Sequence, residues 1–150
     1  MQRGTPIEIL ENNAGHGQRG KSWEIPVETD ISMVELNILA YLRLTKLFLP
    51  KLVSRGHGRI LYTASVAGFE PGPLQAVYHA TKAFVLSWSE ALATELDETG
   101  VTVTALCPGP TDTDFSRKQT RKIRVRCHFG LRRDRHYVAR EHHRLIRLQA

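Results

Sequence analysis

No stretch of this sequence is long and apolar enough to cross a lipid bilayer. A membrane-spanning helix needs about 20 consecutive apolar residues. The most apolar segment, residues 31–53, is interrupted by polar and charged side chains (Glu35, Asn37, Arg43, Lys46 and Lys51). Met1 to Pro6 is polar and lacks the apolar core of a signal peptide. These absences predict a protein with no membrane partner.

Cysteine is scarce, and nothing in the sequence has the spacing of a metal site. Cys107 and Cys127 are the two cysteines in 150 residues, and they need not pair. Four histidines near the carboxyl end also lack metal-ligand spacing (His128, His136, His142 and His143). We therefore predict no metal, and a reduced, cytoplasmic setting.

The net charge of +6 combines two different compositions. Residues 1–115 hold nine Lys/Arg and thirteen Asp/Glu, whereas residues 116–150 hold twelve Lys/Arg and two acids. The whole chain, with 41% hydrophobic and 24% charged residues, has the composition of a soluble globular protein. We predict one folded domain over residues 1–115 and a basic, Arg/His-rich tail, poorly ordered, over residues 116–150.

Short apolar runs alternate with longer segments of helical periodicity. The runs predict buried strands at three places (residues 7–10, 59–64 and 101–106). A helical pattern follows Pro26, and Pro50 is expected to kink or end it. Its apolar stripe is Ile31, Val34, Ile38, Tyr41, Leu42 and Leu49. A second helix is predicted over residues 76–98, with Gly100 as its stop signal.

Strand–helix–strand–helix–strand order predicts an α/β fold with a parallel sheet and right-handed crossovers. Ligand sites in such sheets gather at the carboxyl ends of the strands. Asn12, Ser65 and the Pro108–Gly109 pair each follow a predicted strand. We expect them to share one site.

Tyr78 and Lys82 lie one helical turn apart, so their side chains share a face of the second helix. An adjacent cation favours phenolate and is expected to lower the tyrosine pKa from about 10. A phenol tuned in this way can exchange a proton with a carbonyl or alcohol oxygen. Ser65 could hold the same oxygen by a hydrogen bond. A Tyr-x-x-x-Lys pair alone is common in amphipathic helices, so the prediction depends on the motifs around it.

Those motifs carry a family resemblance. Asn12-Asn13-Ala14-Gly15 follows the first run, Asn37 lies in the first helical segment, and Cys107-Pro108-Gly109-Pro110-Thr111-Asp112-Thr113 follows the last run. Together with Ser65 and the Tyr78–Lys82 pair, they resemble the short-chain dehydrogenase/reductase family over residues 7–115. The resemblance implies a partial Rossmann-like parallel sheet of three strands with crossover helices, and NAD or NADP as the cofactor.

The resemblance also implies a role for each matched residue. Tyr78 resembles the catalytic acid/base, Lys82 the group that lowers its pKa and binds the nicotinamide ribose, and Ser65 the ligand of the substrate oxygen. Asn37 resembles the helix asparagine that supports a water-mediated proton relay. The implied cofactor-binding residues are Asn12, Ala14, Gly15, Tyr78, Lys82, Pro108, Gly109, Thr111 and Thr113.

The family's first glycine-rich strand–helix unit has no counterpart here, because only eleven residues precede Asn12. Gly15-His16-Gly17-Gln18-Arg19-Gly20 spells G-x-G-x-x-G, but Pro26 disfavours the helix that this motif must open. We therefore predict a loop there. We expect the first strand to be an exposed sheet edge, NAD(P) binding to be impaired, and activity to be lost through truncation.

We interpret the chain as an oxidoreductase of the short-chain dehydrogenase/reductase type, which transfers a hydride between NAD(P) and a carbonyl or secondary alcohol. The expected partners are that small-molecule substrate and a second copy of the chain through the long helices; nucleic acid is not expected. The alternative is a non-catalytic fragment, or a nucleic-acid-binding protein that acts through its basic tail. For the tail itself, a solvated extension remains open, and an out-of-frame or degenerate coding sequence is the preferred explanation.

Overall fold

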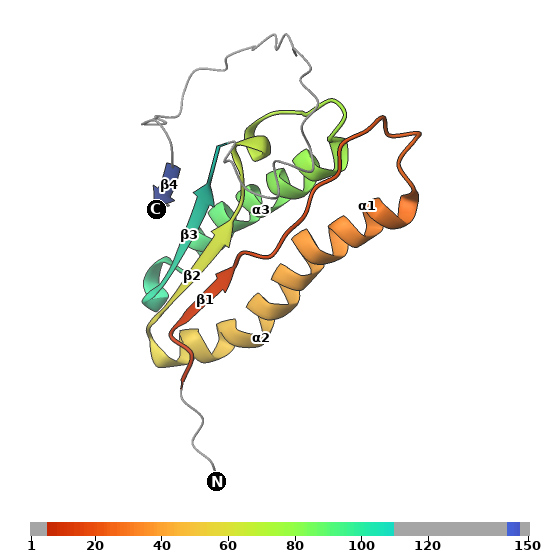
Figure 1. The fold of residues 1–150 in the computed structure, drawn as a ribbon. Helices are drawn as coiled ribbons and strands as arrows, with labels where there is room; N and C mark the ends of the chain where they lie inside the picture. Colours follow the sequence, from red (N-terminus) through yellow and green to blue (C-terminus); the bar gives the residue numbers. More distant parts are fainter. Residues whose placement is uncertain (1–5, 110–143, 148–150) are drawn as a thin grey trace.

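The structure, a computed structural model, describes residues 6–109 and 144–147. Its sheet contains three parallel strands, which are β1 (Ile9–Asn12), β2 (Gly58–Thr63) and β3 (Val101–Cys107). A fourth strand, β4 (Arg144–Arg147), pairs antiparallel with β3, and the order is β1-β2-β3-β4 (Figure 1). The predicted partial Rossmann-like α/β fold is confirmed, whereas β4 was not predicted.

Two helical connections join the parallel strands. The first consists of α1 (Val27–Val34), the π-helical η1 (Glu35–Leu39) and α2 (Ala40–Arg55) without a break. The second contains the short 3-10 helix η2 (Val66–Phe69), the long α3 (Ala76–Glu95) and the 3-10 helix η3 (Asp97–Thr99). The helix α3 begins at Ala76 as predicted and ends within a few residues of the predicted end.

The π turn has a cause in the burial pattern of the first connection. Around η1, the buried residues Met33, Asn37, Tyr41 and Thr45 recur at every fourth position, and the next buried residue, Leu52, lies further along α2. An α-helix has 3.6 residues per turn, so a strict four-residue repeat would move steadily around it. A π turn takes up the surplus by bonding i to i+5. The predicted stripe was wrong at Ile31, which is 51% exposed.

Pro50 was predicted to kink or end the helix, and it does not end it, because α2 continues to Arg55. Proline removes one N–H donor, and the carbonyl left without it lies one turn earlier. Pro50 and Lys46 are both on the exposed side of α2, where water can satisfy that carbonyl. The helix ends instead at Gly56, whose φ of 70° is the left-handed conformation that glycine adopts without strain.

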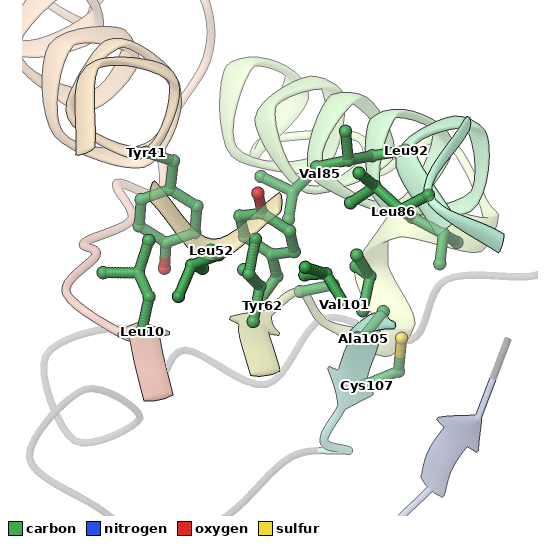
Figure 2. Packing of buried hydrophobic residues seen from close by; sticks show 14 residues of the cluster. Leu10, Tyr41, Leu52, Tyr62, Val85, Leu86, Leu92, Val101, Ala105 and Cys107 are labelled. Carbon is green, nitrogen blue, oxygen red and sulfur yellow. The ribbon is translucent and has the colours of Figure 1, made fainter. Parts of the chain in front are cut away.

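The hydrophobic core lies between one face of the sheet and the helices α2 and α3 (Figure 2). Alternate strand residues point toward the helices, as the burial pattern of each strand shows. The largest of its fully buried side chains are Tyr41, Leu52, Ile60, Tyr62 and Val85. Burying one such aliphatic side chain contributes about 1.5–3 kcal/mol relative to exposure. This core therefore fixes α3 against β2 and β3, and with it the face that carries Tyr78 and Lys82.

Candidate active site

The carboxyl ends of the three parallel strands are tied together by hydrogen bonds. The backbone N–H of Val66, just after β2, donates to the carbonyl of Pro108, just after β3, at 3.1 Å. The Thr63 hydroxyl at the end of β2 donates to Asn13 Oδ1, just after β1, at 2.9 Å. These contacts bring the segments that follow β1, β2 and β3 into one region, as the sequence predicted.

Ser65, in the segment that follows β2, and Tyr78 of α3 are joined by a side-chain hydrogen bond. Ser65 also caps η2, since its Oγ accepts the backbone N–H of Ala67 at 3.1 Å. Gly68 lets this turn approach α3 closely, because a Cβ there would lie 2.8 Å from the Lys82 carbonyl oxygen. Ser65 and Tyr78 are almost fully buried, so the hydrogen bond between them lies in a region that largely excludes water.

Lys82 is buried, and its ammonium points toward the end of β2. Its Nζ donates to the Thr63 carbonyl at 2.7 Å and lies 5.9 Å from the centroid of the Tyr78 ring. Burial lowers the pKa of Lys82 to about 8, and an interaction with Cys107 acts in the opposite direction. The lysine remains largely protonated at neutral pH.

The expected lowering of the Tyr78 pKa by Lys82 is wrong for this structure. Burial raises the pKa of Tyr78 above its ordinary value, and the hydrogen bond with Ser65 offsets only part of that rise. A phenolate in the protein interior loses its hydration, so the neutral phenol is favoured. Tyr78 is therefore a neutral phenol at neutral pH.

Asn37 is fully buried and holds the loop that follows β1. Its Oδ1 accepts the backbone N–H of His16 at 3.0 Å, and its Nδ2 donates to the His16 carbonyl at 2.9 Å and to Thr81 Oγ1 at 3.1 Å. A Cβ on Gly15 would lie 3.0 Å from Asn37 Oδ1 and 3.6 Å from Lys82 Nζ. Asn37 thus places Gly15 beside the lysine, and its role in a proton relay stays a prediction.

The other predicted cofactor-binding residues take varied positions. Asn12 is the last residue of β1; it is 2% exposed, and within the described residues its side-chain amide has no hydrogen bond. Ala14 is exposed on the turn before Gly15. A Cβ on Gly109 would meet no atom within 4 Å. The Pro108 carbonyl accepts the hydrogen bond from the Val66 N–H that is described above. Thr111 and Thr113 lie outside the described residues.

The G-x-G-x-x-G sequence of residues 15–20 lies in a loop, as predicted. No helix begins at Gly20; the next one is α1, which starts at Val27 after Pro26. The Gly20 N–H donates to the Leu74 carbonyl at 2.9 Å, so this loop contacts the loop that precedes α3. Because a dinucleotide fingerprint must open a helix toward the pyrophosphate, residues 15–20 do not form one.

The polar groups at the strand ends suit a nicotinamide nucleoside. An ammonium carries three N–H donors, and the Thr63 contact of Lys82 uses one of them. The Tyr78 hydroxyl is the second polar group, and Gly15 and Gly109 offer backbone without a side chain. Donors of this kind fit the hydroxyl groups of a ribose, so the residues present fit the nicotinamide half of NAD or NADP.

Sequence reasoning missed several residues on which this geometry depends. The Thr63 carbonyl accepts a hydrogen bond from Lys82, and Thr81 Oγ1 accepts one from Asn37. Gly68 permits the close approach of η2 to α3. Thr81 carried one usable signal, since a hydroxyl residue between Tyr78 and Lys82 on a largely buried helix needs a hydrogen-bond partner. Among the described residues, no three His, Cys, Asp or Glu side chains gather as a metal site, and no helix is long and apolar enough to span a membrane.

Comparison with known proteins agrees with this geometry. The sequence model of the short chain dehydrogenase family matches residues 1–124. A ketoacyl reductase of Nostoc sp. is 39% identical over 104 residues, which is 69% of this chain and 36% of that protein. An uncharacterized oxidoreductase of Staphylococcus epidermidis is 40% identical over 110 residues, which is 73% of this chain and 48% of that protein. The chain therefore spans less than half of the length of these relatives.

Solved structures show the same fold. A short-chain dehydrogenase from Sphingobium yanoikuyae in complex with NADPH superimposes with a TM-score of 0.73 at 37% identity, over 79% of this chain and 46% of that one. A putative NAD(P)-dependent gluconate 5-dehydrogenase from Beutenbergia cavernae with bound NADP gives a TM-score of 0.72 at 32% identity, over 75% and 45%. The chain belongs to the short-chain dehydrogenase family, a family of oxidoreductases.

Proposed function

We propose that Tyr78, Lys82, Ser65 and Asn37 form the catalytic set of a carbonyl reductase. The observation that carries the proposal is the buried Ser65–Tyr78 hydrogen bond with the Lys82 ammonium beside the Tyr78 ring. The reduced nicotinamide, when bound, supplies a hydride to the carbonyl carbon. The Tyr78 hydroxyl gives its proton to the carbonyl oxygen, and Ser65 donates a hydrogen bond to the same oxygen.

Lys82 and Asn37 support this proton transfer in the proposed mechanism. The Lys82 ammonium stabilises the phenolate that Tyr78 becomes and binds a ribose hydroxyl of the cofactor. Asn37 holds the Gly15–His16 loop next to Lys82 and supports the path by which a proton returns to Tyr78. The raised pKa of Tyr78 favours the protonated phenol at neutral pH, which suits reduction of a carbonyl.

The test is the substitution Tyr78→Phe, which removes the phenolic oxygen atom alone. The substrate to try first is a 3-oxoacyl thioester, because relatives are named ketoacyl reductase and very-long-chain 3-oxoacyl-CoA reductase. At millimolar NADPH, which offsets the weak cofactor binding proposed below, oxidation of NADPH is followed by absorbance. Its rate should fall by roughly 10²–10⁴-fold in Tyr78→Phe, the usual contribution of a general acid.

Tyr41→Phe is the matched control for that test. Tyr41 is also buried, and its hydroxyl has no hydrogen-bond partner within the described residues, so its removal should leave turnover unchanged. Turnover retained in Tyr78→Phe would contradict the proposed acid/base role.

We also propose that NAD(P)H binds this chain more weakly than it binds the full-length relatives, to the point where turnover is lost at ordinary cofactor concentrations. The support is that residues 15–20 form no phosphate-binding helix start. A fluorescence titration should give a dissociation constant in the millimolar range. Saturation at micromolar NADPH would contradict this part of the proposal.

Self-association through the helices is the proposed assembly. Large apolar side chains on α1 and α2 are exposed, among them Val27 at 60%, Ile31 at 51% and Leu47 at 66%. Exposed apolar patches of this kind mark interaction surfaces. Sedimentation velocity should show a dimer that Leu47→Lys dissociates, and an unchanged sedimentation coefficient in that variant would count against the helices as the interface.

We also propose that residues 1–115 form a catalytic part and that residues 116–150 form a separate basic segment. The proposed location of the protein is the cytoplasm. The competing function is nucleic-acid binding through residues 116–150, which is supported by their ten arginines alone. An electrophoretic shift of DNA or RNA that vanishes on deletion of residues 116–150 and weakens steeply with salt would favour the competitor. Fractionation of expressing cells tests the location.

A further inference from the structure

The hydroxyl of Thr81 connects two parts of the site. Thr81 is 1% exposed and lies on α3 between Tyr78 and Lys82. Asn37 Nδ2 donates to Thr81 Oγ1 at 3.1 Å, and Thr81 Oγ1 donates to the Tyr78 carbonyl at 2.8 Å. We propose that Thr81 is a positioning residue, which holds the turn carrying Tyr78 and Lys82 at a fixed place relative to the Gly15–His16 loop.

The direction of these hydrogen bonds follows from the number of donors. The Asn37 amide has one acceptor oxygen and two N–H groups; the oxygen and one N–H are used on the backbone of His16. The second N–H goes to Thr81. A threonine hydroxyl has one proton, and the Tyr78 carbonyl can only accept, so Thr81 must donate there and accept from Asn37. Without this hydroxyl a buried N–H of Asn37 would lose its partner.

The close packing around Gly15 explains why a fixed position of the α3 turn matters for the proposed proton transfer. A Cβ on Gly15 would lie 3.0 Å from Asn37 Oδ1 and 3.6 Å from Lys82 Nζ, so the loop has little room beside the ammonium. A shift of the α3 turn would change the distance from Lys82 to the loop and the direction of the Tyr78 hydroxyl together. Errors of about 1 Å in such positions can cost 10²-fold in rate.

Ser89 is the matched control on the same helix. It is fully buried, and its Oγ donates to the Leu86 carbonyl three residues earlier at 2.8 Å, the same backbone contact that Thr81 makes with Tyr78. The hydrogen bonds described for Ser89 stay within α3. Ser89→Ala therefore removes the backbone contact alone, whereas Thr81→Val removes that contact and the link to Asn37 while keeping the side-chain shape.

The first test is amide hydrogen exchange followed by NMR, which needs no turnover. The His16 N–H, held by Asn37, should exchange at least about tenfold faster in Thr81→Val than in the wild type. Thr81→Ser and Ser89→Ala should remain within about twofold of the wild type. Equal exchange in Thr81→Val and Ser89→Ala would overturn the proposal. If Thr81→Val does not fold, Thr81→Cys replaces it, and equal exchange in Thr81→Cys and Thr81→Ser would overturn the proposal.

The second test is kinetic and rests on the proposed function. In Thr81→Val, kcat should fall roughly tenfold with KM within about threefold, because positioning affects the chemical step more than binding. Thr81→Ser should restore kcat, and Ser89→Ala should match the wild type. Unchanged kcat in Thr81→Val would overturn the positioning role. These rates are measured at millimolar NADPH, because weak cofactor binding is itself proposed. A wild-type chain without turnover under that condition would count against the proposed function, and the exchange result would then decide the role of Thr81.

Discussion

Lys82 and Tyr78 share one physical circumstance, which is burial in the protein interior. Burial disfavours the charged form of both side chains. It therefore lowers the pKa of the lysine and raises that of the tyrosine. Charge proximity alone, which a sequence can suggest from a four-residue spacing, gives the wrong sign for Tyr78, because burial depends on the whole fold.

The lowered pKa of Lys82 predicts a stability that rises with pH. Between pH 8 and 10.5, the lysine is protonated in the unfolded chain and increasingly neutral in the folded one, so the unfolded state binds more protons and folding gains as pH rises. The free energy of unfolding, from urea titrations, should increase by about 2 kcal/mol between pH 8 and 10 relative to Lys82→Met.

The buried tyrosines set the upper limit of that window. Burial raises the pKa of Tyr41 and of Tyr62 to about 12, so above about pH 10 the folded state binds more protons than the unfolded one and stability falls. Parallel pH profiles of the wild type and Lys82→Met below pH 10 would contradict the burial of a charged lysine.

Tyr41 and Tyr62 form a natural pair for measuring one hydrogen bond. Their rings stack with centroids 6.0 Å apart and both are buried, but only Tyr62 has a described partner, the Thr45 hydroxyl at 2.7 Å. Tyr62→Phe should lower the free energy of unfolding by about 1 kcal/mol. Tyr41→Phe should be neutral or stabilising by chemical denaturation. Equal effects of the two changes would show that the Thr45 contact is not formed in solution.

At the scale of elements, the sequence predicted what depends on local pattern and missed what depends on packing. The strands β2 and β3 and the helix α3 follow from apolar runs and helical periodicity, and the structure confirms them. Gly100 was predicted to stop α3, but α3 ends at Glu95 and Gly100 is the C-cap of η3 instead. The π turn at η1 could not be predicted, because its sequence consists of ordinary helix residues and the turn answers a four-residue burial repeat. The same holds for the contact of Asn37 with His16, which lie 21 residues apart.

Two glycine stops with nearly the same backbone conformation allow a controlled test of close packing. Gly56 and Gly100 have φ of 70° and 74°, but a Cβ on Gly56 would meet nothing within 4 Å, whereas a Cβ on Gly100 would lie 2.0 Å from the Gly56 carbonyl oxygen. Gly56→Ala should cost about 1 kcal/mol for the left-handed conformation. Gly100→Ala should cost about 1–3 kcal/mol more, because the backbone must also move. Thermal or urea unfolding measures both, and equal losses would refute the contact.

At the scale of the whole molecule, the described sheet is covered on one face and open on the other. The helices α2 and α3 both lie above the face that carries the core (Figure 2), while Ile9, Arg59 and Thr102 on the alternate positions are exposed. The strand β1 pairs only with β2 among the described residues, so its other edge presents unpaired backbone groups. An open edge of this kind promotes association between sheets.

Ile9→Lys tests that consequence. Ile9 is 60% exposed on β1, and lysine is a common guard of natural sheet edges. The variant should reduce light scattering at high protein concentration without lowering the free energy of unfolding. Leu10→Lys is the contrast, because Leu10 is 8% exposed in the core and a buried charge should unfold the chain. Unchanged scattering in Ile9→Lys would show that association does not proceed through β1.

The contact between Gly56 and Gly100 lies just before β2 and β3, at the opposite end of those strands from Ser65 and Pro108. The close packing of Gly100 on Gly56 and the candidate active site therefore lie at different ends of the same strands. A designer who wishes to raise the melting temperature can vary the loops next to these two glycines without touching Tyr78 or Lys82. By the same separation, natural drift in those loops can proceed while the geometry of proton transfer is preserved.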